Sequence, residues 1–285
     1  MSDMGFFEAY FLWRNAMAAA VVAAALCGYL GVFIVLRRMA FVSAALSQIS
    51  GLGVALSFFI GSFLGVDPHG AHVPWYVSPI FCALVLSCAA AALLALPGRR
   101  RRAQPETLVA LAYLAASAAV VLVLASPRIV QEAHEVGELL FGSAVAVREQ
   151  NLVALAVAAL LAAVVHGAFF KDFVFVSFDR ETAATVGYPV ARLDAALNLT
   201  IAVAAAMATR ALGTLPVFAF LVLPAGAALL VARRLRSAAV LAVAIAIVSA
   251  VLGYYLSFVY QLPTGPTMAA LCALAWVPAG LLRRK

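Results

Sequence analysis

Residues 213–227 read GTLPVFAFLVLPAGA, and residues 39–55 read MAFVSAALSQISGLGVA. Both stretches lie within apolar segments, yet they contain glycine, proline, serine or glutamine. A helix that faces lipid normally lacks such residues, because irregular or polar backbone at membrane depth is tolerated only where protein or a water-filled cavity covers it. The two stretches therefore indicate a transport path rather than a membrane anchor.

The composition is typical of a membrane protein. Of the 285 residues, 66% are hydrophobic and only 11% are charged, whereas a soluble domain carries roughly 25% charged residues. No interval between the apolar segments is long enough for a second soluble domain, so we expect one transmembrane domain over residues 1–285. The net charge of +7 does not predict nucleic-acid binding, because the basic residues form short clusters beside apolar segments.

The apolar segments predict an all-α, polytopic transmembrane bundle. A spanning helix needs about 20 mostly apolar residues. Nine segments qualify, or eight if the stretch around 195–232 is divided differently, and glycine and proline are expected to shorten or break some of them. The nine are 16–36, 41–65, 79–96, 107–125, 152–170, 195–212, 213–232, 238–259 and 267–282.

The basic residues predict the orientation. Of the 19 lysines and arginines, 15 lie in alternate connections or at the C-terminus. The positive-inside rule places this set in the cytoplasm, and hence the N-terminus outside and the C-terminus inside. The set consists of Arg37, Arg38, Arg99–Arg102, Lys171, Arg180, Arg192, Arg233, Arg234, Arg236 and Arg283–Lys285.

The inner stretch 171–194, KDFVFVSFDRETAATVGYPVARLD, contains a predicted short amphipathic helix. Asp179 can cap its N-terminus, and Gly187 can end it in the left-handed conformation. Such a helix between two spans suits docking onto another protein; a solvated loop helix without a partner is the alternative.

No catalytic or nucleotide-binding motif is present in the sequence. There is no GxxxxGK[ST] loop, and only two lysines occur, so P-loop binding of ATP by this chain is excluded. HExxH and GxSxG are absent as well. We therefore expect a transport subunit without catalysis or a cofactor of its own, for which any ATP is bound and hydrolysed by a partner.

Four motifs, in this order and spacing, resemble the ABC-3 family, the membrane permeases of ABC importers for zinc and manganese. They are LFGSAVAV at 140–147, FDRETAATVG at 178–187, GTLPVFAFLVLPAGAA at 213–228 and LPTGPT at 262–267.

The resemblance implies an importer in a bacterial inner membrane, with alternating access driven by ATP. Its implied partners are two cytoplasmic ATPases, a second permease copy or paralogue, and an extracytoplasmic metal-binding protein. It further implies that the inner helix is the coupling helix received by the ATPase, with Asp179, Arg180, Glu181, Thr182 and Gly187 at its ends.

The sequence departs from the family at residues 43–50. There the family reads G-D-x-L-S-H-x-S, with the aspartate and histidine four residues apart on one helix face, where they can hold a divalent cation. This chain has Ala44 and Gln48 at those positions. Three alternatives follow: the chain passes a metal without a tight site, it carries another solute, or it forms the degenerate half of a heterodimeric permease.

The interrupted segments define the predicted translocation pathway. Its residues are Ser43, Ala44, Ser47, Gln48, Gly51, Gly213, Pro216 and Pro224. Metal ligands at the outer mouth are a further hypothesis, for Asp67, His69 and His72; the alternative is that these are ordinary solvated loop residues.

Two polar residues in apolar segments have other interpretations. His166 is predicted to be a packed histidine, and Arg210 either faces a cavity or lies at the outer end of its span. An ion-coupled secondary transporter is the rival class, but it would need membrane-embedded carboxylates, and the central parts of these spans contain none.

Overall fold

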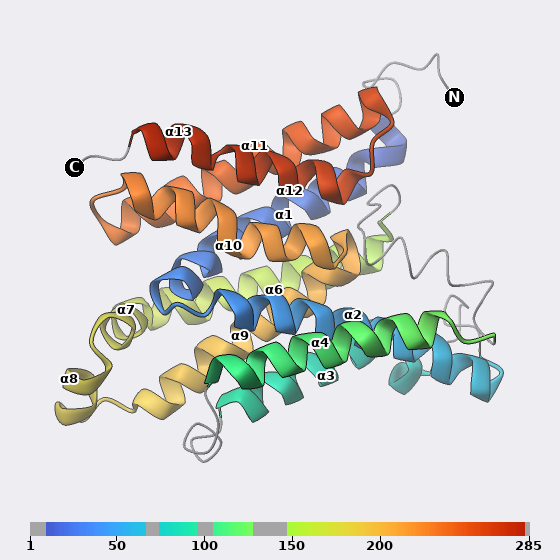
Figure 1. Cartoon of the computed structure of the whole chain (residues 1–285), viewed down its shortest axis with the longest axis horizontal. Helices are drawn as coiled ribbons and strands as arrows, with labels where there is room; N and C mark the ends of the chain where they lie inside the picture. The colour runs from blue at the N-terminus through green and yellow to red at the C-terminus, as the bar shows by residue number, and fades with distance from the viewer. Residues whose placement is uncertain (1–9, 67–73, 96–104, 128–146, 283–285) are drawn as a thin grey trace.

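A computed structural model describes residues 10–66, 74–95, 105–127 and 147–282, and this part of the chain is helical and free of β-strand. The predicted helical bundle is confirmed (Figure 1). The helices are α1 (Tyr10–Leu36), α2 (Ala40–Leu64), α3 (Pro79–Ala95), α4 (Pro105–Leu124), α6 (Glu149–Ala168), α7 (Phe170–Phe178), α8 (Arg180–Thr185), α9 (Val190–Leu212), α10 (Thr214–Val231), α11 (Leu235–Tyr260), α12 (Thr264–Leu274) and α13 (Trp276–Leu281), with a 3-10 turn at Trp75–Val77.

The helices follow the predicted spans closely. Within the described residues, 8 stretches are long and apolar enough to cross a membrane, and α3 is a shorter apolar helix that runs alongside them. α1 begins at the right-hand end in Figure 1, and α13 ends at the left-hand end, where α7 and α8 also lie. The stretch that was hard to divide is split at Gly213, and α9 begins at Val190, five residues before the predicted start.

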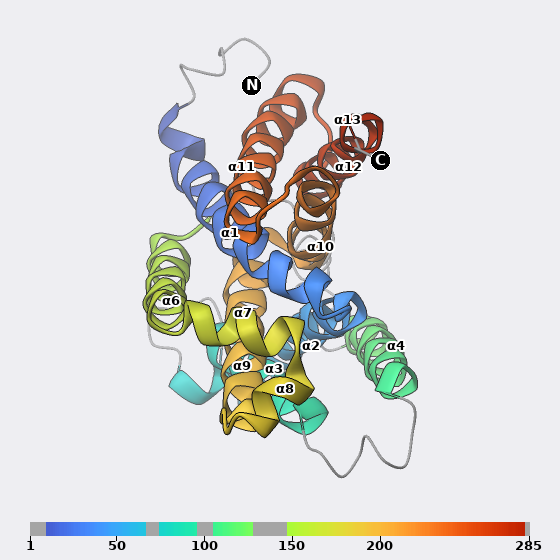
Figure 2. The ribbon, with the colours of Figure 1, turned by 90° about the vertical axis from the view of Figure 1, so that its left-hand side faces the viewer.

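Four helices form the centre of the bundle. The spans of α1, α2 and α9 are each 67% buried and that of α10 is 61% buried, whereas α4 and α6 are only 17% and 22% buried. Figure 2 places α4 and α6 on opposite flanks of this centre. The two helices that carry the glycine-, serine- and proline-rich stretches, α2 and α10, are therefore inner helices, and they contact each other.

Small residues allow these helices to approach closely, as is usual where lipid supplies no hydrophobic drive between helices. A Cβ on Gly31 of α1 would meet the carbonyl oxygen of Leu221 in α10. A Cβ on Gly53 of α2 would lie 2.6 Å from the Cα of Ala83 in α3. Backbone packed against backbone thus fixes α2 between α3 and the centre of the bundle.

Candidate functional site

Helix α8 is capped at both ends by residues next to it in the sequence. The Asp179 carboxylate accepts a hydrogen bond from the Thr182 backbone N–H at 2.9 Å. Hydrogen bonding with the side chain of Thr182, and then with its backbone, lowers the pKa of Asp179. At the other end Gly187 adopts φ +91°, and its N–H donates to the carbonyl of Ala184 while that of Tyr188 donates to Ala183. This pair of bonds is the Schellman arrangement. Both predicted helix ends are confirmed.

The surface of α8 is almost entirely exposed. Its first-turn residues Arg180, Glu181 and Thr182 are exposed, and only Ala183, fully buried, joins the core. Next to the helix, the apolar side chains of Phe178 and Val186 are 64% and 66% exposed. An exposed, capped helix with apolar neighbours suits contact with another protein.

Helix α7 was not predicted. Residues 171–178 belong to the predicted polar connection, but they form a helix that packs beside α8 at one end of the bundle (Figure 2). Phe173 and Val176 lie three residues apart, hence on one helix face, and both are buried. That spacing was the available signal, in a segment too short to be read as a span.

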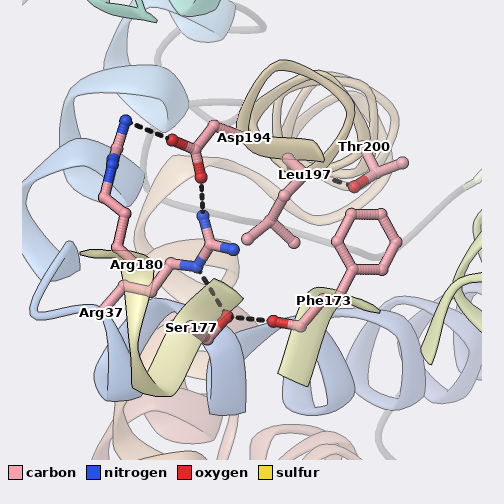
Figure 3. A network of polar contacts seen from close by, with 7 residues as sticks. All are labelled: Arg37, Phe173, Ser177, Arg180, Asp194, Leu197 and Thr200. Carbon is pink, nitrogen blue, oxygen red and sulfur yellow. Dashed lines mark hydrogen bonds and ion pairs between the residues drawn. The ribbon is translucent and has the colours of Figure 1, made fainter. Parts of the chain in front are cut away.

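A polar network joins α7 and α8 to the ends of α1 and α9 (Figure 3). The Arg37 guanidinium, just past α1, contacts the Asp194 carboxylate of α9 at 2.6 Å, and Arg180 of α8 contacts the other carboxylate oxygen at 2.7 Å. Arg37 Nε also donates to Ser177 Oγ at 2.7 Å, and Ser177 donates to the carbonyl of Phe173. Burial lowers the pKa of Arg37, and the charge of Asp194 opposes that lowering.

The sequence places Arg37 among the cations of the inner connections and Arg180 both among those cations and in the predicted coupling helix, without indicating that the two meet. Asp194 was treated as the end of the inner stretch, although it is the sole carboxylate in the sequence of α9. A lone acidic residue in the first turns of an apolar helix was the signal that pointed to a buried ion pair.

Two serines of α2, Ser43 and Ser47, are hydrogen-bonded to the backbone of their own helix. Ser43 Oγ donates to the carbonyl of Ala40 at 2.7 Å, and Ser47 Oγ donates to that of Ser43 at 3.0 Å. Ala44 and Gly51 are buried and Gln48 is half-buried. The hydroxyls of Ser43 and Ser47, two of the predicted pathway residues, are therefore bonded within the helix, whereas the buried Ser50 Oγ of the same stretch has no hydrogen-bond partner among the residues that the structure describes.

The other predicted pathway residues lie at the start and middle of α10. Gly213 is buried, has φ +95° and separates α9 from α10, so the chain turns at a residue that only glycine adopts readily. Pro216 occupies the first turn, where proline is tolerated, while Pro224 lies inside the helix. Both prolines are buried.

Trp276, which nothing in the sequence singles out, packs against α10 beside Pro224. Its indole N–H donates to the carbonyl of Leu223 at 2.9 Å. Gly226 leaves the space that the indole ring fills, because a Cβ there would collide with it.

A cavity of about 1260 Å³ opens between α2, α3, α4 and the start of α9. Its walls are mainly aliphatic, and its polar end is formed by Arg37, Arg180 and Asp194 of the network, with Asn198 next to them. None of the eight predicted pathway residues lines it. The pathway between α2 and α10 stays a prediction.

The hypothesis of an outer metal site falls on Asp67, His69 and His72, which lie outside the described residues. Within the described part of the chain, no three His, Cys, Asp or Glu side chains gather closely enough to hold a metal ion. His166 is a packed histidine, as expected: it is buried, stacks on Phe173 at 4.6 Å and shares a hydrogen bond with Thr200.

Arg210 lies in the last turn of α9, at the helix end rather than its centre. Of the two interpretations of this residue, its position agrees with the one at the end of the span.

These features define a polytopic helical membrane protein with a short, exposed helix between two of its spans. Residues 9–283 match the sequence model of the ABC 3 transport family, and the chain belongs to this family. It is therefore a permease component of a transport system.

Individual relatives agree over nearly the whole chain. The "Manganese transport system membrane protein MntC" of Listeria monocytogenes is 26% identical over 97% of this chain and 92% of its own length. The "Chelated iron transport system membrane protein YfeD" of Yersinia pestis is 29% identical over 95% of this chain and 85% of its own. A chain of "PsaBC from Streptococcus pneumoniae in complex with Fab" has the same fold, with a TM-score of 0.78 at 23% identity, covering 96% of this chain and 94% of that one.

Proposed function

We propose that this chain is the permease of an ABC importer for a divalent metal ion, with manganese as the ion it fits best. The observation that carries this proposal is the capped, exposed helix α8 in a chain of the ABC 3 transport family. Two relatives whose names specify manganese or chelated iron support a metal as the substrate.

The choice of manganese over zinc rests on Gln48. Its amide oxygen is a hard, neutral ligand, which suits manganese better than zinc, since zinc prefers imidazole and thiolate. Ala44, one helical turn earlier, supplies no ligand, so binding at this level of α2 is weak. Weak binding is compatible with transport, because an ion must also be released.

In the proposed assembly, the end of the bundle that carries α7 and α8 faces the cytoplasm. Basic residues support this orientation: Arg37 and Arg180 lie there together, and Arg234 immediately precedes α11 at the same end. The C-terminus would then be cytoplasmic and the N-terminus outside, in a bacterial inner membrane. A separate ATPase binds α8, and a binding protein delivers metal from the opposite side.

A second candidate function follows from Ala44 and Gln48. If metal transport needs a carboxylate and an imidazole at this level, the chain pairs with a non-identical permease that provides them. Purifying the assembled transporter and counting its permease species separates this arrangement from a homodimer.

Association with an ATPase tests the proposal. Val186→Asp places a charge on an exposed apolar side chain beside α8 and disturbs no buried contact. It is expected to abolish copurification of the ATPase subunit while the permease stays folded. Ser237→Asp, an exposed position in the first turn of α11 at the same end, is the matched control and should leave association unchanged. Undiminished association of the Val186 variant would remove α8 from the coupling role.

A further inference from the structure

One carboxylate holds three helices together at the α8 end. The two oxygens of Asp194 each engage a different arginine, Arg37 at 2.6 Å and Arg180 at 2.7 Å (Figure 3). These three residues come from positions far apart in the sequence: Arg37 directly follows α1, Arg180 begins α8, and Asp194 lies in the second turn of α9.

The two halves of this network differ in their exposure to solvent. The side chains of Arg37 and Asp194 are each only 10% exposed, whereas that of Arg180 is 54% exposed. A buried charge cannot lose its partner without a large desolvation penalty, so the Arg37–Asp194 pair is fixed. The exposed contact of Arg180 is weaker and screened by water, so it can open and reform.

Helix α8 has few other attachments to the core. Within its six residues only Ala183 is buried, and the Asp179 and Thr185 side chains bond within the helix region itself. The Arg180–Asp194 contact is therefore the charged link from α8 to the inner helices α1 and α9.

We infer that Asp194 is a positioning residue that transmits displacement of α8 to the ends of α1 and α9. The inference rests on the proposed function, in which α8 receives the movement of an ATPase. Arg37, which is also hydrogen-bonded to Ser177 of α7, holds the Asp194 carboxylate in place. Displacement of α8 reaches this carboxylate through its contact with Arg180. Such a link converts a shift of one exposed helix into a shift of two central ones.

The variant Arg180→Gln tests this role, because it removes the charge on an exposed side chain and leaves the buried Arg37–Asp194 pair intact. In transporter purified with its ATPase bound, metal transported per ATP hydrolysed should fall about two- to fivefold, as expected for losing an exposed charge contact. Arg180→Lys should restore most of the coupling. Arg192→Gln, an exposed arginine two residues before Asp194, is the matched control and should behave as wild type.

A second, double variant removes the Arg37–Asp194 ion pair without leaving a buried charge. Arg37→Met combined with Asp194→Leu replaces the buried pair by apolar side chains, which proteins often tolerate. The double variant should be as stable as wild type in thermal unfolding yet show the same loss of metal transported per ATP as Arg180→Gln. Normal coupling in either variant, with the ATPase bound, would overturn the inference.

Hydrogen–deuterium exchange on the purified permease separates this inference from the proposed function. In Arg180→Gln, the amides of α8 and of residues 37–39 should exchange faster together, whereas Arg192→Gln should match wild type. If the wild-type transporter moves no metal, the proposed function fails. The exchange measurement still tests whether Asp194 connects α8 to the end of α1, because it does not depend on transport. Unchanged exchange at residues 37–39 would overturn the inference.

Discussion

Replacing Gly53 with alanine should destabilise the permease through a single contact between α2 and α3. The added Cβ would lie 2.6 Å from Ala83 Cα, 2.8 Å from Ala83 N and 2.7 Å from the carbonyl oxygen of Cys82. All three atoms belong to the backbone of α3, so no side chain can rotate away, and one helix must move. Overpacking of this kind costs about 1–3 kcal/mol, while exchanging glycine for alanine inside a helix returns about 1 kcal/mol.

Gly167 in α6 provides the matched control for that substitution. A Cβ there meets no atom within 4 Å, so Gly167→Ala keeps the helix-propensity gain without the steric cost. The difference in unfolding free energy between the two variants should therefore be about 1–3 kcal/mol. Thermal unfolding of both variants in the same detergent measures it. A Gly53→Ala variant as stable as Gly167→Ala would refute the close backbone packing of α2 on α3.

Three further predictions concern α8 and α10. Asp179→Ala should weaken ATPase binding in a pull-down because the helix loses its N-terminal cap, whereas Asp179→Asn should retain it. Hydrogen bonding from Thr182 lowers the pKa of Asp179 in the folded protein. The charged cap therefore contributes its full stabilisation above the pKa of an aspartate in the unfolded chain, about 3.9, and loses it as the pH falls through the lowered pKa of the folded protein. The asparagine variant, which has no carboxylate here, should lack this part of the pH dependence. Gly187→Ala meets no neighbour within 4 Å, so its cost of about 1–2 kcal/mol comes from the backbone alone, and faster amide exchange confined to α8 should reveal it. Gly226→Ala should lower the unfolding temperature by colliding with Trp276, and the double variant with Trp276→Leu should regain part of the loss; purely additive effects would contradict the contact.

Local features of the chain were predictable because their causes are local. The caps of α8 depend on Asp179 and Gly187, each within a few residues of the groups it satisfies. The boundary between α9 and α10 depends on Gly213, whose positive φ disfavours every other residue. In these cases residue type and backbone preference are enough.

Contacts between distant segments were not predictable from one sequence. Arg37 and Asp194 are separated by 157 residues, and the lone carboxylate of α9 indicates an ion pair without indicating which arginine completes it. Trp276 was read as part of a final span, since nothing next to it indicates Leu223, 53 residues earlier, as its hydrogen-bond partner. Helix α7 was missed because nine residues are too few for a span and its buried face contains only Phe173 and Val176.

The cellular metal content tests the central claim most directly. A bacterium lacking its own manganese and zinc importers would express this chain with its ATPase and binding protein, beside an ATPase-dead control, and its metals would be measured by mass spectrometry. The account predicts an ATPase-dependent gain of manganese that exceeds any gain of zinc. No ATPase-dependent gain of any metal, from a complex shown to assemble, would contradict it.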